Sequence, residues 1–317
     1  MKKSMSRVAF FVAMLVMFVH SAFAHTQVST LSFPSVESGT RLENFPILVR
    51  LSDGNPVGFS YTEFPTASNL AFRVKHVGVY LPFEVDTWNT SGESLIWVSV
   101  PSFERTTELE MFLCSDDKAN PAPEFVNDAA TLWQRAGYIG VWHMNGLDSE
   151  GYLVDSSGHN LHAKRDTATG LPAVFASSSP LGGGCVGNMK NGTAQNSGGA
   201  LVPGARFANI DFAGTMNFSC WLCSYSGGRL IASSADFLQG FCYPFSKSNA
   251  GIFIMSAPYD DRPVSPTLNY CIGANYSHDG NNSLVWASGG NAAGVWRYLD
   301  LLVRSDGTAR GFENGRA

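Results

Sequence analysis

Residues 142–160 read WHMNGLDSEGYLVDSSGHN and combine an aromatic start with a polar turn. The start, Trp142 to Asn145, is typical of an edge strand. The later Asp155-Ser156-Ser157-Gly158 is typical of a tight turn, because Asp and Ser side chains bond nearby backbone and Gly accepts a positive φ. No set of side chains in this stretch is arranged for bond cleavage. It predicts a β-rich surface that holds a ligand.

Short strand patterns precede this stretch at regular intervals. The clearest is RLENFPILVRL at 41–51, followed by the turn residues SDGNP at 52–56. Further strands are predicted at 69–73, 78–86, 94–101 (where Pro101 ends the strand) and 107–114. A spacing of ~8–12 residues between strands is typical of sandwiches and barrels. With 32 Gly and 15 Pro in the chain, we predict an all-β fold: two antiparallel, jelly-roll-like β-sandwich domains in tandem.

The first 24 residues have the three parts of a secretory signal peptide. Lys2, Lys3 and Arg7 precede an apolar run of 12 residues from 8 to 19, and Ala22-Phe23-Ala24 provides a cleavage site. A membrane-spanning helix needs ~20 residues. We therefore expect cleavage after Ala24, no stable membrane span, and a mature protein that is secreted, periplasmic or on the cell surface. A retained anchor is the alternative.

The remaining chain divides at a segment rich in Pro and Ala. The sequence NPAP at 120–123 and a short helical pattern at 126–135 predict a linker over 118–136. The predicted domains are therefore a first sandwich at 25–117 and a second at 137–317.

The charge balance argues against one class of partner. The whole chain carries 21 Lys+Arg and 26 Asp+Glu, and removal of residues 1–24 takes away three positive charges, leaving 18 − 26 = −8. A nucleic-acid-binding surface needs a basic face that replaces condensed counterions. We predict no nucleic-acid partner.

The first predicted domain resembles a bacterial domain of unknown function. The resemblance is carried by NFPILV at 44–49, LPFEVDTW at 81–88 and IWVSVP at 96–101. Members of that family precede laminin-G-like modules in secreted proteins, and they occur in periplasmic extensions of proton-channel proteins of the MotA/TolQ/ExbB type. The family usually ends in a Tyr-Tyr-Gly-Asn-like strand, whereas this chain has MFLCS at 111–115. The first predicted domain therefore diverges from the family at its last strand.

The second predicted domain resembles the laminin-G-like, concanavalin A-like β-sandwich. The resemblance rests on VWHM at 141–144, DSSG at 155–158, LGGG at 181–184, NFSCW at 217–221 and GVWRY at 294–298, and it continues to 310. The family usually has two or three strands after the hairpin that FENG forms at 312–315, and this sequence stops at Ala317. We expect an incomplete domain with an exposed edge and poor stability. A cooperative melt of residues 25–317 well above room temperature would contradict this expectation.

Glu84 and Asp86 are the strongest candidates for catalysis. Laminarinase-like glycoside hydrolases, which are concanavalin-like sandwiches, carry a Glu-x-Asp-x-(x)-Glu motif on one strand. Retaining hydrolysis needs two carboxyl groups ~5–5.5 Å apart. In EVDTWN at 84–89, Asn89 occupies the position of the third acid. The motif also lies in the first predicted domain and not in the concanavalin-like one. We therefore interpret Glu84 as structural and predict no catalytic residues.

Asp155 is the one candidate metal ligand. Laminin-G-like domains often bind Ca²⁺ at the sandwich rim through an Asp and backbone carbonyls, which suits a cation that prefers oxygen. The competing interpretation, which we favour, is that Asp155 closes an Asx-turn. His143, His159 and His162 lie nearby but lack the spacing of a zinc hydrolase. They are interpreted as surface turn histidines.

The remaining candidate functional residues are cysteines and tryptophans. Six cysteines allow 15 disulfide pairings, and the pattern around Cys220 and Cys223 is that of a strand, where positions three apart point to opposite faces. These two are interpreted as buried structural residues. Four tryptophans can stack on sugar rings, although burial is the commoner role on strands: Trp142, Trp221, Trp286 and Trp296.

Together these patterns predict an exported, non-catalytic binding or adhesion protein of the cell envelope, with glycan or cell-surface protein ligands. One alternative is a periplasmic component of a biopolymer-transport proton-channel system, as relatives of the first domain imply. The other is an inactive or degraded glycoside hydrolase.

Overall fold

The computed structural model describes the N-terminal half almost continuously and the C-terminal half in segments. The described residues are 25–34, 36–77, 79–114, 127–165, 174–176, 180–181, 185–187, 200–201, 216–223, 245–247, 250–256, 270–278, 281–284, 287–289, 296–304 and 309–316. Within them the chain forms antiparallel β-sheets and a single short α-helix. The fold is all-β, as predicted. The predicted signal peptide, residues 1–24, lies outside the described residues.

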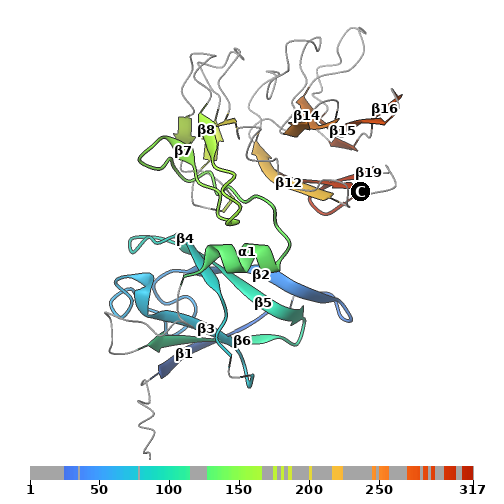
Figure 1. The fold of residues 1–317 in the computed structure, drawn as a ribbon. Helices are drawn as coiled ribbons and strands as arrows, with labels where there is room; N and C mark the ends of the chain where they lie inside the picture. Colours follow the sequence, from blue (N-terminus) through green and yellow to red (C-terminus); the bar gives the residue numbers. More distant parts are fainter. Residues whose placement is uncertain are drawn as a thin grey trace, which may run out of the picture.

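Six strands form two three-stranded sheets in the N-terminal half. Their bounds are β1 His25–Ser32, β2 Arg41–Leu51, β3 Leu70–Val74, β4 Phe83–Thr87, β5 Ser94–Glu104 and β6 Glu108–Cys114. The strand orders are β1-β6-β3 and β2-β5-β4, and every pairing is antiparallel. The two sheets lie one above the other in Figure 1.

One apolar core joins these two sheets. Alternate residues of each strand point inward, so β2 contributes Ile47 and Val49, and β6 contributes Leu109 and Met111. Phe72 of β3 packs edge-to-face on Phe83 of β4, with ring centroids 5.7 Å apart. The predicted strands at 41–51, 69–73 and 107–114 are confirmed, and the period-two pattern of apolar residues is the reason.

Pro101 does not end its strand, contrary to the prediction. Strand β5 continues to Glu104, with Val100 opposite Phe45 and Ser102 opposite Glu43 in an unchanged register. On its other side β5 is covered by β4 only from Leu95 to Val98. Pro101 therefore lies where one side of the strand is an edge, and a missing N–H is tolerated there.

A short helix follows these sheets. Helix α1 spans Ala129–Arg135, and the Asp128 carboxylate caps it by accepting a hydrogen bond from the Thr131 backbone N–H at 2.9 Å. Leu132 and Trp133 are buried against the β2-β5-β4 sheet. Figure 1 shows α1 lying between that sheet and the strands of the C-terminal half. The helix lies within the segment predicted to be helical, 126–135, and it is packed on the sheet.

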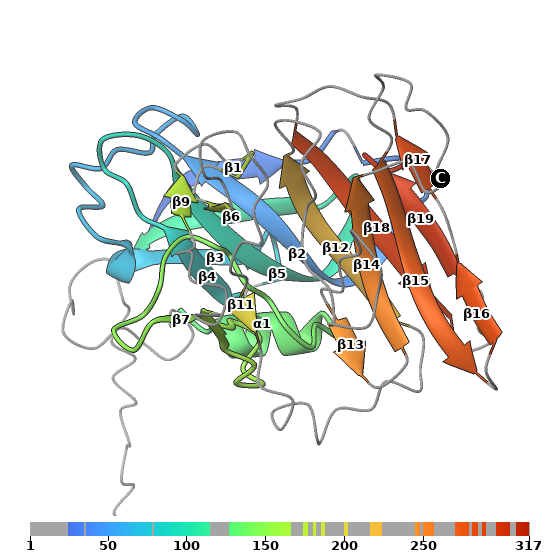
Figure 2. The same ribbon diagram turned by 90° about the horizontal axis from the view of Figure 1, so that it is seen from above.

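The described segments of the C-terminal half form two larger sheets and two smaller ones. The larger are β12-β18-β19 and β13-β14-β15-β16, in which β17 also pairs with β15. Their strands are β12 Met216–Cys223, β13 Phe245–Lys247, β14 Ala250–Ser256, β15 Tyr270–His278, β16 Asn281–Leu284, β17 Ala287–Gly289, β18 Trp296–Val303 and β19 Ala309–Glu313. Strand β15 contacts β18 and β19, so the two larger sheets face each other, as Figures 1 and 2 show.

The smaller sheets are short. They are β11-β8-β7 and β10-β9, with strands β7 Tyr152–Leu153, β8 Ala163–Arg165, β9 Val174–Ala176, β10 Cys185–Gly187 and β11 Ala200–Leu201. After β19, Asn314 and Gly315 take φ values of 50° and 79°. Glu313 and Arg316 exchange backbone hydrogen bonds around them. This Asn-Gly hairpin turn is the one expected at 312–315.

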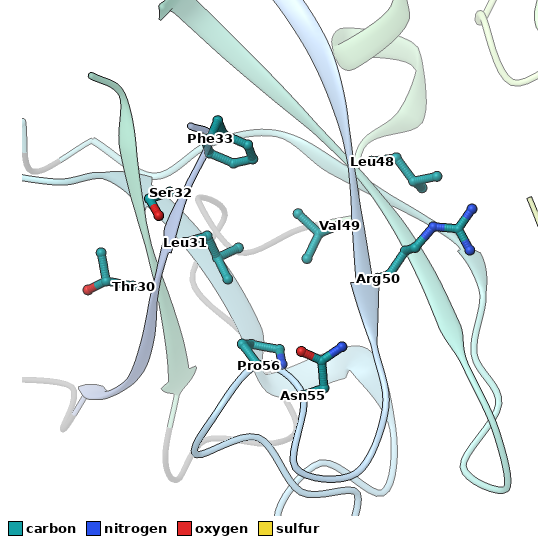
Figure 3. Close-up of a pocket in the computed structure, with 9 residues that line it drawn as sticks. All are labelled: Thr30, Leu31, Ser32, Phe33, Leu48, Val49, Arg50, Asn55 and Pro56. Atoms are coloured by element: carbon teal, nitrogen blue, oxygen red, sulfur yellow. The ribbon is translucent and has the colours of Figure 1, made fainter. Parts of the chain in front are cut away.

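A hollow of about 270 Å³ opens between β1 and β2 (Figure 3). Thr30, Leu31, Ser32, Phe33, Leu48, Val49, Arg50, Asn55 and Pro56 line it. Arg50 is its only ionisable lining residue, and its guanidinium is held by Glu93 at 2.5 Å and by the Pro180 carbonyl at 2.8 Å. The chemistry-bearing side chains lie elsewhere.

Candidate functional site

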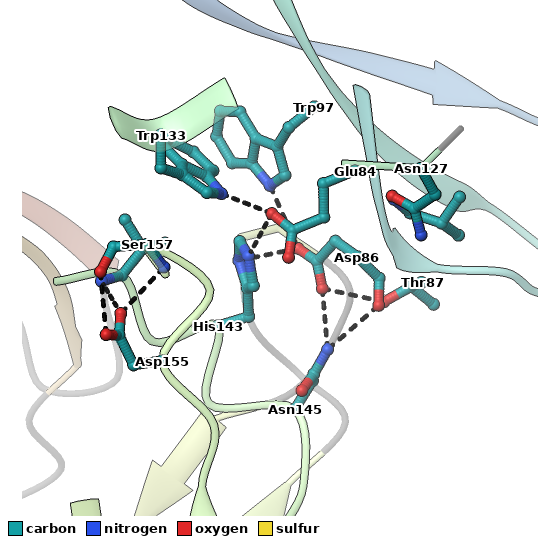
Figure 4. Close-up of polar contacts among 12 residues, drawn as sticks. Glu84, Asp86, Thr87, Trp97, Asn127, Trp133, His143, Asn145, Asp155 and Ser157 are labelled. Atoms are coloured by element: carbon teal, nitrogen blue, oxygen red, sulfur yellow. Dashed lines mark hydrogen bonds and ion pairs between the residues drawn. The ribbon is translucent and has the colours of Figure 1, made fainter. Parts of the chain in front are cut away.

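The two carboxylates of β4 meet His143. Glu84 and Asp86 are two positions apart on the strand, so they point to the same face. The His143 imidazole lies between them: Nε2 is 2.9 Å from Glu84 Oε2, and Nδ1 is 3.3 Å from Asp86 Oδ2 (Figure 4). We call Glu84, Asp86 and His143 the carboxylate–histidine cluster. It joins β4 to a loop that follows α1.

Neighbouring side chains donate further hydrogen bonds to the Glu84 and Asp86 carboxylates. Trp133 Nε1 donates to Glu84 Oε2 at 2.5 Å, and Trp97 Nε1 donates to Asp86 Oδ2 at 3.3 Å. Asn145 Nδ2 donates to Asp86 Oδ1 at 2.8 Å. The side chains of His143, Glu84 and Asp86 are only 10%, 9% and 3% exposed. Both carboxylates are therefore enclosed by donors from their own chain.

Burial and charge act in opposite directions on this cluster. Burial lowers the pKa of His143, but its hydrogen bond to Glu84 and the charges of Glu84 and Asp86 outweigh burial and raise it. Burial raises the pKa of Glu84, but hydrogen bonds and the His143 charge outweigh burial and lower it. The cluster therefore favours the protonated imidazole of His143 and the ionised form of Glu84.

These shifts predict how stability depends on pH. A raised His143 pKa stabilises the fold fully below the ordinary histidine value of about 6.5, and this contribution is lost as pH rises through the folded pKa. A lowered Glu84 pKa stabilises above its ordinary value of about 4.3, and this contribution is lost as pH falls through the folded pKa. The free energy of unfolding, measured in urea, should therefore be highest at about pH 5–6. A decline above that range that persists unchanged in His143→Gln would contradict the assignment.

Two aromatic rings pack against the cluster. The ring of Trp97 stacks near His143 with centroids 6.3 Å apart, and the ring of Trp133 lies 5.9 Å from it. Both indoles also donate hydrogen bonds to the carboxylates, so the rings pack directly beside them. The interpretation of Glu84 as structural stays a prediction.

The prediction that His143 is a surface turn residue is wrong. Its imidazole is buried and bound to partners on β4, which lie 57 and 59 residues earlier in the chain. His159 is exposed, as predicted. His162 is half-buried, and its Nδ1 accepts a hydrogen bond from the Asp155 backbone N–H at 3.0 Å. Local turn chemistry could not reveal the long-range partners of His143.

The predicted edge strand at 142–145 is also wrong. These residues form no strand, and Met144 has a φ of 58°. The preceding Val141 gives its backbone groups to the turn: its N–H donates to Asp155 Oδ1 at 2.9 Å, and its carbonyl accepts from Ser156 N–H at 2.8 Å. The Asp155 side chain and the Ser156 N–H therefore satisfy the backbone groups of Val141, and this segment does not have to pair with a strand.

Asp155 closes the Asx-turn that the sequence predicts. Its Oδ1 accepts from the N–H groups of Val141 and Ser157, and its Oδ2 accepts from the Leu161 N–H and the Ser157 hydroxyl, all at 2.8–2.9 Å. Asp155 is 4% exposed. Calcium does not fit this residue, because donors already point at both oxygens and would repel a cation. Among the described residues, no group of three or more His, Cys, Asp or Glu side chains has an arrangement that could hold a metal ion.

Two aromatic side chains lie next to each other on the β12-β18-β19 sheet. Trp221 of β12 lies opposite Tyr298 of β18, with ring centroids 5.4 Å apart and planes inclined by 54°. Trp221 is 40% exposed and Tyr298 is half-buried. We call these two residues the aromatic pair. The expectation of burial is wrong for Trp221, which sits at an outward position of its strand.

The neighbours of the aromatic pair follow the strand alternation. Cys220 points to the opposite face, and burial raises the pKa of its thiol to about 12, which fits an inert structural cysteine.

Of the other tryptophan candidates, Trp142 and Trp296 are half-buried, and Trp142 Nε1 donates to the Leu161 carbonyl at 3.0 Å. Trp286 and the side chain of Cys223 lie outside what the structure describes.

Comparison of the chain with protein-family models, curated proteins and solved structures finds no significant match. In the part of the chain that is described, no helix has the length and apolar character needed to cross a membrane.

Proposed function

We propose that this chain is an exported, non-catalytic binding protein of the cell envelope that recognises glycans. The observation that carries the proposal is the aromatic pair, Trp221 and Tyr298, held side by side on two neighbouring strands. Exposed aromatic faces suit the C–H surfaces of sugar rings, and the polar edges of Trp and Tyr suit sugar hydroxyls. The two strands fix the pair in place before any ligand arrives.

The carboxylate–histidine cluster supports a non-catalytic role. A glycosidase needs one carboxylic acid that can protonate a leaving group and a second carboxylate that faces the sugar. Here Glu84 and Asp86 accept hydrogen bonds from Trp133, Trp97 and Asn145 and contact His143. Their lone pairs are engaged within the protein.

Replacing Trp221 by alanine should weaken glycan binding roughly 30-fold, because truncating a central aromatic side chain costs about 2 kcal/mol or more. The measurement is binding to immobilised neutral glycans. Phe45→Ala is a matched control, since Phe45 is 38% exposed and stacks on Phe103 in the other half of the molecule. Equal affinity of Trp221→Ala and the native chain would refute the assignment of the site.

Two other functions give different results in the same experiments. Release of reducing sugars by the native chain, lost in Glu84→Gln, would favour a hydrolase. Co-purification with a proton-channel complex, without glycan binding, would favour a periplasmic transport component. Capture of a cell-surface protein, unaffected by Trp221→Ala, would favour a protein ligand at another surface.

A further inference from the structure

We propose that Asn145 is a site of spontaneous deamidation and that its conversion to aspartate loosens the junction, by which we mean the contacts of His143 and Asn145 with β4. The proposal is independent of glycan recognition. Asn145 is followed by Gly146, and the glycine nitrogen can attack the asparagine carboxamide because glycine has no Cβ to obstruct the approach. Asn145 is also exposed and lies in a loop, so water reaches it.

The reaction needs water as its only co-reactant. The Gly146 backbone nitrogen gives up its proton and forms a bond to Asn145 Cγ. The bond between Cγ and Nδ2 then breaks, and the amide nitrogen leaves as ammonia. Water opens the resulting cyclic imide at either carbonyl, which gives aspartate or isoaspartate at position 145. The product carries a carboxylate where the native chain carries a neutral amide.

The backbone distinguishes Asn145 from a second asparagine that precedes glycine. Asn314 lies before Gly315 in the hairpin turn, has a φ of 50°, and accepts a hydrogen bond from the Tyr298 N–H through Oδ1 at 2.9 Å. In the left-handed region ψ is about +30 to +60°, which turns the nitrogen of the next residue away from the side chain. Asn145 does not have a positive φ, so this barrier to attack applies to Asn314 and not to Asn145.

The Asn145 side chain holds its loop to β4. Its Nδ2 donates to Asp86 Oδ1 at 2.8 Å and to the Asp86 backbone carbonyl at 3.1 Å, and Figure 4 shows the amide facing the Asp86 carboxylate. The other oxygen of that carboxylate contacts His143. Because these hydrogen bonds retain the amide nitrogen, we expect deamidation to be slower in the folded chain than in the chain unfolded by urea.

Conversion to aspartate turns this attraction into repulsion. The amide donor is replaced by a carboxylate that only accepts hydrogen bonds, so both bonds to Asp86 are lost. Two carboxylates then face each other, and like charges at this separation destabilise one another. The imidazole of His143 is already shared between Glu84 and Asp86, so the added charge gains no cation of its own. The loop therefore moves away from β4, and the junction loosens.

The experiment ages the full chain at mildly alkaline pH and follows it by peptide-mapping mass spectrometry and amide hydrogen exchange. The native chain should gain an acid at position 145, and less at position 314. Asn145→Asp, which reproduces one product, should melt about 4–8 °C below the native chain, because two hydrogen bonds are lost and a like charge is added. Its amides in residues 137–165 should exchange faster, while those of β5 keep their protection. Asn145→Gln is the matched control, since glutamine must form a larger imide ring more slowly, and ageing should leave its exchange unchanged.

Three outcomes would overturn the proposal. An aged native chain that keeps its amide at position 145, while the urea-unfolded chain loses it, would show that the contact with Asp86 protects Asn145. Equal modification of Asn145 and Asn314 would show that the backbone does not select the site. Native melting and native exchange in Asn145→Asp would show that the junction tolerates the charge. If Asn145→Asp does not fold, the exchange of residues 137–165 in the modified fraction of the aged native chain decides the last point.

Discussion

Replacing His143 by alanine should lower the free energy of unfolding by about 3–5 kcal/mol, which is the usual cost of removing one partner from a buried ion pair. The variant leaves Glu84 and Asp86 adjacent, buried and without their cation, while Trp97 and Trp133 lose a packed ring. Urea unfolding followed by tryptophan fluorescence measures the change, because Trp97 and Trp133 both contact the cluster.

His159→Ala is the matched control for this variant. His159 lies in the same loop region but is exposed, so its removal should change stability by about 0.5 kcal/mol or less. His143→Gln separates charge from packing, since it keeps a polar side chain without a positive charge. Equal stabilities of His143→Ala and His159→Ala would show that the cluster does not hold the loop to β4.

Replacing Asp155 by alanine should cost a similar amount, about 3–5 kcal/mol. The reason is that three backbone N–H groups, those of Val141, Ser157 and Leu161, and the Ser157 hydroxyl lose their acceptor together. Each buried donor left unsatisfied costs about 1–3 kcal/mol. Thermal unfolding by circular dichroism, with and without added calcium, measures the effect.

Asp148→Ala is the corresponding control. The Asp148 carboxylate also accepts from two backbone N–H groups, those of Glu150 and Tyr152 at 2.9 and 2.8 Å, but it is exposed to water. Water can replace it, so the melting temperature should change far less than in Asp155→Ala. A calcium-dependent rise in the native melting temperature that disappears in Asp155→Ala would contradict our account and restore the calcium site.

The regular strands could be predicted from the sequence because their determinants are local. The alternation of apolar residues in 41–51 and 107–114 specifies both the strand and its buried face. The Asx-turn at Asp155 and the hairpin at Asn314-Gly315 follow from side-chain chemistry within a few residues. These parts of the fold agree with the structure.

The candidate sites could not be predicted in the same way because their partners are distant in the chain. His143 and Glu84 are 59 residues apart in the chain, and Trp133 of α1 supplies the second donor to Glu84. Trp221 meets Tyr298 through the β12–β18 register. The alternation in each strand gives the face of a residue, but pairing between strands decides its neighbours.

Calorimetric titration of the native chain with a neutral glucan hexasaccharide tests the central claim most directly, because one experiment reports both binding and turnover. Our account predicts a saturable binding heat, followed by a flat baseline, and an affinity roughly 30-fold weaker in Trp221→Ala. A sustained heat of hydrolysis after each injection, abolished in Glu84→Gln and retained in Trp221→Ala, would contradict it.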